Sequence, residues 1–314
     1  MAIRWLSSVL TMHSWPRAVW PRRGNAAVGH RVDYCPGLQA RNEAVSETDK
    51  VVSGSIPEIY DNYLVPLIFE PYAADMACRV ASAKPGAVLE TAAGSGVVTR
   101  ALSPLLGDEA RYVVTDLTQP MLDRVVQMQS NASYIEWRQA DALSLPFEDR
   151  SFDAVCCQFG VMFFPDRVAG FAEARRVLRP GGRFIFNAWD RIEENEFADV
   201  VTQAASLLFP DNPPLFLART PHSYHQVDQI EADVRAAGFR KVDVVTIAEK
   251  SRAPSPRHPA VAYLQGTPLR NEIEARDANR LEEVTARAAA MIAERFGAGP
   301  VEAKIQGHVV VAYA

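Results

Sequence analysis

The sequence predicts an α/β fold in which a doubly wound, mostly parallel sheet of seven strands carries a helical cap. Two observations lead to this prediction. Between residues 87 and 189, short apolar segments typical of buried strands alternate with helical segments. A turn of small residues also joins the first of these strands to the helix that follows it. Alternation at this spacing indicates right-handed crossovers between parallel strands.

The stretch from residue 87 to residue 105 organises the rest of the chain. Residues 87–90 form the first expected strand, and Glu90 lies near its carboxyl end. Ala92, Gly94 and Gly96 then make a turn, and residues 97–105 continue as a helix. Glycine lets a ligand approach the backbone closely, and a helix N-terminus offers unpaired N–H groups. This combination predicts a site for a nucleotide-like ligand.

The other elements follow from apolar runs, helical periodicity and turn residues. Thr118 is expected to cap the helix after the second strand, and residues 251–306 are expected to be mainly helical. The further expected strands span residues 112–116, 134–138, 152–158, 183–189, 241–248 and 308–313. The expected helices span residues 73–82, 119–130, 166–178, 194–208, 227–237 and 279–295, and a proline-rich loop spans residues 210–226.

Polar side chains lie near the carboxyl ends of five expected strands. They are Glu90, Asp116, Asp141, Gln158 and Asn187. In a doubly wound sheet the ligand binds outside these strand ends, where the strand order reverses. We therefore expect the five side chains to converge on one ligand site.

Composition excludes several classes of protein. The chain has 314 residues, of which 48% are hydrophobic, enough for one large domain or one domain with additions. A formal net charge of −5 argues against a nucleic-acid-binding surface, and no apolar run reaches the length of a membrane span. The four cysteines lack the spacing of a disulfide framework, so we expect reduced thiols and a cytoplasmic protein.

The expected domain organisation has three parts. Residues 1–55 are a disordered leader and linker, residues 56–190 form the ligand-binding core, and residues 191–314 supply the helical cap and the last strands. Residues 1–42 hold six arginines, no lysine and one acidic residue. One interpretation is a transit peptide for an organelle matrix. The other is a disordered tail, or upstream sequence translated from the wrong start codon.

Two common nucleotide-binding motifs are missing. A dinucleotide fingerprint would place glycine or alanine three residues after Gly96, where Thr99 stands. The chain has no Tyr-x-x-x-Lys pair, and it has no phosphate-binding loop that ends in Gly-Lys-Ser/Thr. An NAD-dependent oxidoreductase is therefore disfavoured.

Five motifs in register resemble those of another family. They are Val88–Gly96, Val114–Asp116 with Met121, Ala140–Ala142, Phe152–Val155 and Val177–Arg183. With these motifs, residues 56–190 resemble the class I S-adenosylmethionine-dependent methyltransferases of the ubiquinone/menaquinone-methyltransferase-like (type 11) group. The resemblance implies a Rossmann-like methyltransferase fold and S-adenosylmethionine as cofactor. Ala92 departs from the pattern, because the family often has glycine there.

The resemblance also implies roles for the residues around the turn. Glu90 would face the amino group of the methionyl part of the cofactor, directly or through water. Ala92, Gly94 and Gly96 would pass under its amino acid and ribose. Asp116 would accept hydrogen bonds from both ribose hydroxyls, since a carboxylate offers two acceptors to two adjacent donors.

By the same resemblance, the next loops would hold the adenine and the methyl end. Leu117 and Met121 would pack on the adenine ring, and Asp141 would accept from its amino group, with Ala142 beside it. The remaining pair, Gln158 and Phe159, would flank the methionyl portion near the transferable methyl group.

The reaction itself requires few catalytic groups. The methyl group is already activated on a sulfonium, so positioning and exclusion of water supply most of the rate. A general base is needed only when the nucleophile must lose a proton. The catalytic residues are therefore not assigned from the sequence. His222 and His225 have no cysteine or carboxylate partner at metal-site spacing, so we expect no metal.

Several residues admit two interpretations. Tyr60, Tyr63 and Tyr72 are half-buried aromatic residues of a first helix, or one of them closes over the ligand. Met162, Phe163 and Phe164 line an apolar substrate pocket or pack in the core. His222, Tyr224 and His225 are proton acceptors on the cap or belong to an ordinary loop. Asp153, at the start of the fourth strand, is interpreted as a structural acid.

The sequence thus predicts a methyltransferase that acts on a small, apolar or aromatic metabolite. The alternative is a non-catalytic protein of the same fold that binds S-adenosylmethionine or has a regulatory role. The expected partner is a small-molecule substrate, with no nucleic acid and no membrane span. The acceptor atom and the oligomeric state are not predicted.

Overall fold

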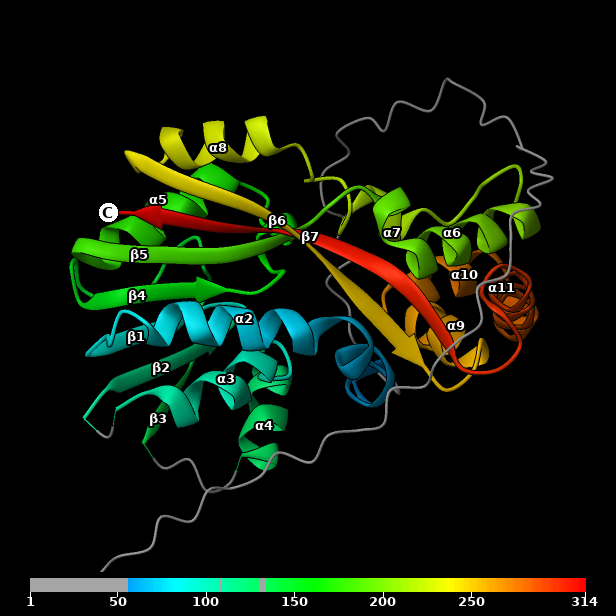
Figure 1. Cartoon of the computed structure of the whole chain (residues 1–314), viewed down its shortest axis with the longest axis horizontal. Coiled ribbons are helices and arrows are strands. Elements are labelled where there is room, and N and C mark those ends of the chain that lie inside the picture. Colours follow the sequence, from blue (N-terminus) through cyan, green and yellow to red (C-terminus); the bar gives the residue numbers. More distant parts are fainter. Residues whose placement is uncertain (1–55, 108, 130–133) are drawn as a thin grey trace, which may run out of the picture. The chain divides into compact units, whose positions relative to one another are not determined.

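A computed structural model describes residues 56–107, 109–129 and 134–314, and the predictions for residues 1–55 fall outside it. The described chain forms a seven-stranded sheet with the strand order β3-β2-β1-β4-β5-β7-β6 (Figure 1). Strands β1 to β5 run parallel, and β7 is antiparallel to both β5 and β6. The strand order reverses between β1 and β4. The predicted doubly wound, mostly parallel sheet is therefore confirmed.

The bounds of the elements are as follows. The strands are β1 Ala87–Glu90, β2 Arg111–Asp116, β3 Ile135–Gln139, β4 Phe152–Cys157, β5 Leu178–Trp189, β6 Lys241–Ala253 and β7 Val301–Tyr313. The α-helices are α1 Ile56–Ile59, α2 Glu70–Ala81, α3 Val97–Leu102, α4 Gln119–Met128, α5 Arg167–Val177, α6 Glu196–Leu208, α7 Phe216–Arg219, α8 Val227–Ala236, α9 Arg257–Gln265, α10 Leu269–Asp277 and α11 Leu281–Phe296. The π-helix is η2 Tyr60–Phe69, and the 3-10 turns are η3 Ser103–Leu105, η4 Val161–Phe163, η5 Ile192–Glu194 and η6 Ala278–Arg280.

Both faces of the sheet are buried at its centre, and side chains alternate between the two faces along each strand. On β5, Ile185 belongs to the apolar cluster that α2 and α3 cover. Its neighbours Phe184 and Phe186 belong to the second cluster, where Phe171 of α5 stacks on Phe186 with 5.0 Å between ring centroids. Helices on both faces leave the carboxyl edge of the parallel strands free for a ligand.

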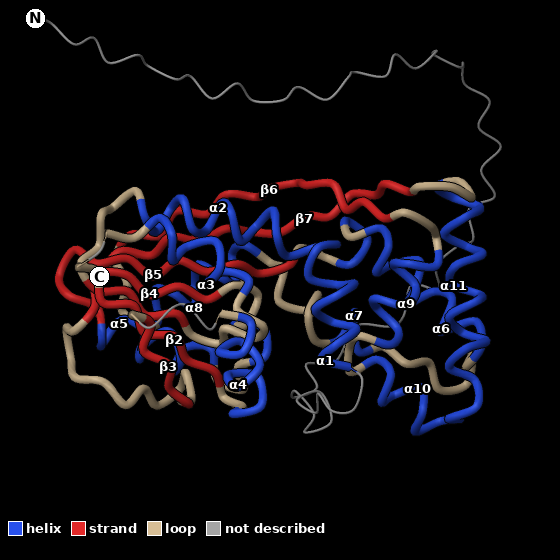
Figure 2. The backbone as a smooth tube through the Cα atoms, turned by 90° about the horizontal axis from the view of Figure 1, so that it is seen from below, coloured by secondary structure: helices blue, strands red, loops and turns tan. Residues whose placement is uncertain are grey.

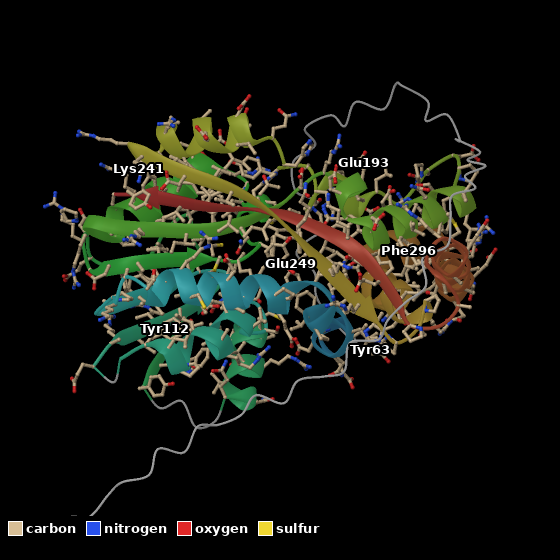
Figure 3. All side chains as sticks on the ribbon, in the orientation of Figure 1. Tyr63, Tyr112, Glu193, Lys241, Glu249 and Phe296 are labelled. Atoms are coloured by element: carbon tan, nitrogen blue, oxygen red, sulfur yellow. The ribbon has the colours of Figure 1, made fainter. Side chains whose placement is uncertain are left out.

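Two long strands connect the sheet to a group of helices. Strands β6 and β7 pair along their full length, from Lys241 and Tyr313 to Ala253 and Val301. They run past the parallel strands to α6, α9, α10 and α11 (Figures 1 and 2). Figure 3 labels Lys241 where β6 begins and Phe296 at the end of α11. We call α6, α7 and α9–α11 the helical group; it supplies part of the site described below.

Several element boundaries differ from the predictions. The fifth strand begins at Leu178, not at 183, because Leu178 already pairs with Phe152 before the register shifts at the Pro-Gly-Gly segment. The sixth and seventh strands are longer than expected, so residues 251–253 and 301–306 are strand and not helix. The loop at 210–226 contains α7. Pairing over a long sequence separation decides each strand end, and local propensity does not report it.

The first helices that the structure describes and one helix cap also differ from the predictions. The helix expected at 73–82 begins at Glu70, and η2 precedes it directly as a π-helix with Pro66 inside. Thr118 occupies the N-cap of α4, but its side chain makes no cap hydrogen bond. Its hydroxyl donates instead to Oδ1 of Asp116 at 3.0 Å.

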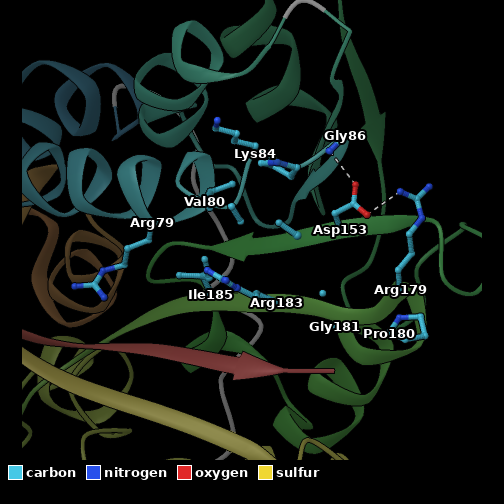
Figure 4. A pocket seen from close by; sticks show the side chains of 14 residues that line it. Arg79, Val80, Lys84, Gly86, Asp153, Arg179, Pro180, Gly181, Arg183 and Ile185 are labelled. Carbon is cyan, nitrogen blue, oxygen red and sulfur yellow. Dashed lines mark hydrogen bonds and ion pairs between the residues drawn. The ribbon is translucent and has the colours of Figure 1, made fainter.

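Asp153 lies at the opposite edge of the sheet from the carboxyl ends. Its Oδ2 accepts hydrogen bonds of 2.9 Å from the backbone N–H groups of Gly86 and Ala87, and its Oδ1 accepts from Arg179 at 2.8 Å (Figure 4). These contacts join the starts of β1, β4 and β5 around a polar cavity, so Asp153 has the structural role expected of it. Among the described residues, no helix is long and apolar enough to cross a membrane.

Candidate functional site

A cavity of about 360 Å³ opens at the carboxyl ends of β1, β2 and β4. We define two sides of it. The turn side comprises Glu90, residues 92–95, Val97, Val98, residues 116–118, Met121 and residues 140–143. The aromatic side comprises Tyr60, Leu64, Ile68, Phe69, residues 158–160, residues 163–165, Trp189, Phe216, Leu217, Pro221, His222, Tyr263 and residues 266–268. The cavity therefore lies where the strand order reverses, as expected for this sheet.

Asp116 joins the end of β2 to the turn after β1. Its Oδ2 accepts a hydrogen bond from the backbone N–H of Gly94 at 2.9 Å, and its Oδ1 accepts from the N–H of Thr118 at 2.9 Å. The side chain is 8% exposed. Burial raises the pKa of Asp116, while the hydrogen bonds from Thr118 and Gly94 lower it. A carboxylate can accept further hydrogen bonds beyond these, so it still has capacity for a ligand.

Glu90 is buried at the end of β1 and also lines the turn side. Its Oε2 accepts hydrogen bonds from the hydroxyl of Tyr112 and from Thr99, the latter at 2.8 Å. Burial raises the pKa of Glu90 to about 7, against the lowering effect of these two hydrogen bonds. A buried acid of this kind gains free energy when a cation approaches it.

The turn itself requires left-handed backbone at three positions. Ala92, Gly94 and Gly96 have φ values of +51°, +56° and +74°. Ala92 thus adopts a conformation that favours glycine, at a cost of about 1–2 kcal/mol. Gly160 makes room for it, because a Cβ on Gly160 would lie 2.7 Å from that of Ala92.

The three turn residues do not share one environment. Ala92 and Gly94 line the cavity, and an added Cβ on Gly94 would meet no atom within 4 Å. Gly96 is outside the lining, and an added Cβ there would lie 2.5 Å from a methyl group of Val125 on α4. Gly94 therefore borders the ligand space, whereas Gly96 permits close packing of α3 on α4.

The loops after β2 and β3 complete the turn side. Leu117 is half exposed and Met121 is half-buried, and both line the cavity. Asp141 is exposed, and its Oδ1 accepts a hydrogen bond from the N–H of Leu143 at 2.9 Å. Ala142 lies beside it in the lining.

Two polar atoms without a hydrogen-bond partner indicate whether the expected cofactor fits this cavity. The Oγ of Ser95 and the Oε1 of Gln158 are buried in the cavity lining without a hydrogen-bond partner. The Nε2 of Gln158 donates to the carbonyl of Phe69 at 2.9 Å, which fixes the amide. Buried polar atoms are normally satisfied, so these two lack a polar ligand. An amino acid portion of a nucleoside ligand fits them, since it offers donors and acceptors together.

The aromatic side is a continuous series of rings. The centroid separations are 5.4 Å for Tyr60 and Phe69, 5.8 Å for Phe69 and Phe159, and 3.6 Å for the parallel rings of Phe159 and Trp189. Trp189 lies 6.0 Å from the ring of His222. The separations of 5.4, 5.8 and 6.0 Å are typical of favourable aromatic pairs, and Phe159 and Trp189 stack more closely, so these rings form one wall.

His222 lies at the end of this wall, 5% exposed. Its Nδ1 is 2.8 Å from the carbonyl oxygen of Asp190, and its N–H donates to the carbonyl of Leu217 at 3.1 Å. Its own carbonyl accepts from Nδ1 of His225 at 3.0 Å. Burial lowers the pKa of His222 to about 4, so the ring is neutral near pH 7.

Some expected residues lie elsewhere. Of the five polar residues at strand ends, Asn187 is outside the cavity: β5 continues to Trp189, and the Asn187 side chain is buried within the strand. Met162 is fully buried in the core, whereas Phe163 and Phe164 line the cavity. Neither Tyr224 nor His225 is in the lining; the Tyr224 hydroxyl donates to Asp233 at 2.8 Å.

The tyrosines of the first helices separate in the same way. Tyr60 lines the cavity, Tyr63 packs on the ring of His258 at 4.7 Å, and Tyr72 donates from its hydroxyl to the carbonyl of Ile247 at 2.9 Å. No pattern in the sequence indicates that α7 and α9 contribute to the site. Phe216, Leu217 and Tyr263 reach the cavity only because the helical group folds back on it. Among the described residues, no three His, Cys, Asp or Glu side chains gather as metal ligands.

Known proteins resemble part of this chain. A family model described as a methyltransferase domain matches residues 89–186. The ubiquinone/menaquinone biosynthesis C-methyltransferase UbiE of Shewanella oneidensis is 28% identical, over 54% of this chain and 73% of the relative. The demethylmenaquinone methyltransferase of Staphylococcus carnosus is also 28% identical, over 65% of this chain and 90% of the relative.

A solved structure supports the fold alone. The YcgJ protein of Bacillus subtilis superposes with a TM-score of 0.50 and 16% sequence identity. The superposition covers 77% of this chain and 98% of that protein.

Proposed function

This chain is a class I S-adenosylmethionine-dependent methyltransferase of the UbiE-like group, and we propose that its acceptor is a small molecule with a hydroxylated aromatic ring. S-Adenosylmethionine is the cofactor, and it supplies a methyl group activated on a sulfonium. The proposal for the acceptor rests on one observation, the wall of rings that faces the cavity from Tyr60 to His222.

We assign the cofactor to the turn side. Asp116 is proposed to accept from the ribose hydroxyls, since a buried carboxylate gains most from two adjacent donors. Glu90 is proposed to face the methionyl ammonium, because burial raises its pKa and a nearby positive charge would stabilise its carboxylate form. The adenine is proposed to lie against Leu117, Met121, Asp141 and Ala142, which border the same space.

Glycines and the loop after β4 complete this assignment. Ala92 and Gly94 leave the cavity open beside the backbone, and Gly96 is proposed to act through the shape of the turn. Gln158 is proposed to bind the methionyl part with its free Oε1, and Phe159 to close the space next to the methyl group.

The acceptor half of the site favours a planar, weakly polar ring. Aromatic faces stack on rings of this kind at distances like those between Phe159 and Trp189. A highly charged acceptor would lose its hydration against Phe163, Phe164 and Phe216 without gaining a partner. The names of the two relatives refer to ubiquinone, menaquinone and demethylmenaquinone, which supports a quinone-related ring.

The protein's own contribution is to orient the acceptor and to exclude water. The rings of Tyr60 and Phe69 on η2 and of Phe216 on α7 all line the cavity. A site that excludes water and holds the two reactants in a fixed orientation lowers the barrier to a displacement reaction, by roughly 7–11 kcal/mol in favourable cases.

The test is a methylation screen with two matched groups of acceptors. The purified chain receives S-adenosylmethionine and either hydroxylated rings (catechol, 2-naphthol, 1,4-dihydroxynaphthalene) or ring-free amines and carboxylic acids. We expect products that carry one added methyl group, found by mass spectrometry, in the first group only. Methylation confined to the second group would contradict the proposal. An Asp116→Ala variant serves as the control for turnover that depends on the site.

A further inference from the structure

The environment of His222 fixes which of its two ring nitrogens carries the proton. Nδ1 lies 2.8 Å from the carbonyl oxygen of Asp190. A carbonyl can only accept a hydrogen bond, so Nδ1 must be the donor. In the neutral ring the other nitrogen, Nε2, then carries the lone pair. The backbone thus determines the tautomer of this side chain.

The same contacts hold the ring in place. The N–H and the carbonyl of His222 are both hydrogen-bonded, to Leu217 and His225. Within the part of the chain that the structure describes, no hydrogen bond joins Nε2 to a protein group. His222 is part of the cavity lining, and Nε2 is the ring nitrogen that has no protein partner there.

The charged groups near His222 are few. Asp190, directly after β5, and His225, on the same loop, are titratable residues that act on it. His308 of β7 lies beside both, with Nε2 2.9 Å from the carbonyl oxygen of His225 and 3.5 Å from Oδ1 of Asp190. The effects of Asp190 and His225 oppose each other, and burial dominates both. The ring therefore stays neutral near pH 7, with its lone pair available.

We propose that Nε2 of His222 is the general base that accepts the hydroxyl proton of the aromatic acceptor. This rests on the proposed function, because only an acceptor with an ionisable hydroxyl needs such a base. The acceptor O–H bond breaks, and its proton goes to Nε2. The electron pair that the lost proton leaves on the acceptor forms the new bond to the methyl group. The bond from sulfur to the methyl group breaks at the same time, with its electron pair left on sulfur.

Charge balance supports this role for a buried histidine. Before the transfer the site holds one positive charge, on the sulfonium; after it, the positive charge is on the imidazolium. No net charge is created in a water-poor cavity, so the desolvation penalty that keeps His222 neutral in the free protein is offset during the reaction. Glu90 is less suited, because its Oε2 is already bonded to Tyr112 and Thr99 on the turn side.

The experiment compares His222→Gln with the matched control His258→Gln, whose ring packs on Tyr63 away from the cavity. Binding of S-adenosylhomocysteine is measured first and should be equal in the wild type and both variants. Single-turnover rates are then measured from pH 6 to 9 with the best aromatic acceptor of the screen. We expect His222→Gln to lose about 10²–10⁴-fold at pH 7 and to recover about tenfold per pH unit as the acceptor ionises by itself.

The pH profile separates a base from a merely structural residue. A structural defect lowers the rate by the same factor at every pH, and that result would overturn the proposal, as would a wild-type rate for His222→Gln. If the glutamine variant does not bind S-adenosylhomocysteine, His222→Asn replaces it, since asparagine can still donate to Asp190. Failure of every aromatic acceptor in the screen would remove the proposed function and this role together.

A second measurement needs no turnover. Long-range ¹H–¹⁵N spectra of the wild-type chain report which nitrogen of each histidine is protonated. The His222 signals are assigned by their loss in His222→Gln or His222→Asn. We expect Nδ1 protonated and Nε2 bare at pH 7, and a shift of Nε2 but not of His258 when 2-naphthol and S-adenosylhomocysteine are added. A protonated Nε2, or no shift at saturating 2-naphthol, would contradict the proposal even if aromatic acceptors are methylated.

Discussion

The backbone N–H of Gly94 donates a hydrogen bond to Oδ2 of Asp116 at 2.9 Å, and this bond joins the turn after β1 to the end of β2. Asp116 therefore shapes the site before any ligand is bound. The same carboxylate receives the N–H and the hydroxyl of Thr118 through its other oxygen. One side chain thus holds two loops that border the turn side of the cavity.

Replacement of Asp116 by alanine is expected to weaken binding of S-adenosylhomocysteine by about 1–3 kcal/mol, or roughly 5- to 150-fold. The physical reason is the loss of a charge-assisted acceptor together with the bond that orients Gly94. Calorimetric titration measures the effect. Asp123→Ala, which removes an exposed acid of α4, is the control and should bind as the wild type does. An unchanged dissociation constant in a folded Asp116→Ala protein would refute the assignment.

Gly94 and Gly96 form a matched pair for substitution by alanine. Both have positive φ, so both variants lose about 1–2 kcal/mol of stability from the backbone alone. Gly96→Ala also forces a methyl group toward Val125, which typically costs a further 1–3 kcal/mol or so. Thermal unfolding should therefore show the larger loss for Gly96→Ala.

The same pair should rank in the opposite order for ligand binding. The added methyl group of Gly94→Ala points into open space in the cavity, so this variant should show the larger loss of S-adenosylhomocysteine affinity. Equal losses of affinity in the two variants would argue that Gly94 does not border the cofactor.

Glu90 makes stability depend on pH. Its pKa is about 7 in the folded protein, raised by burial above the ordinary 4.5. A raised pKa means that its contribution is fully present below about pH 4.5 and is lost as the pH rises through 7. Two to three pKa units correspond to a loss of about 3 kcal/mol.

Glu90→Gln removes this loss and keeps an acceptor for Tyr112 and Thr99. Urea unfolding should therefore find the ligand-free variant more stable than the wild type at pH 8.5, by up to about 3 kcal/mol, with little difference near pH 4.5. The variant should also bind S-adenosylhomocysteine more weakly, because the proposed partner of the methionyl ammonium has lost its charge. A variant that is less stable at pH 8.5 would count against the burial of a charged Glu90.

Deletion of residues 1–42 is expected to leave binding of S-adenosylhomocysteine unchanged. The reason is that, among the residues that the structure describes, the first one in the cavity lining is Tyr60. Titration of the shortened and the full chain side by side provides the test. Loss of binding in a folded, shortened protein would mean that part of the site precedes residue 43.

The parallel half of the sheet could be predicted because its signals are local. Strands β1, β2 and β4 are short, largely apolar runs, and a polar residue lies at or just after the end of each strand from β1 to β4. Parallel pairing brings those ends to one edge. Glu90, Asp116, Asp141 and Gln158 therefore meet in the cavity, as we expected from their positions alone. The exception is Asn187, whose side chain is buried within β5, two residues before that strand ends at Trp189.

The sequence by itself determined the fold class and the glycine turn, because these depend on local conformation and on the regular geometry of parallel strands. The reaction class was indicated by the resemblance of its five motifs to a known family. Only the tertiary structure decided which side chains form the aromatic side of the cavity. β6 and β7 pair over 13 positions and bring the helical group against the cavity. Phe216, Tyr263 and His222 become part of the site in this way. Contacts between residues so far apart in the chain leave no periodic signal, since packing and not local propensity selects them.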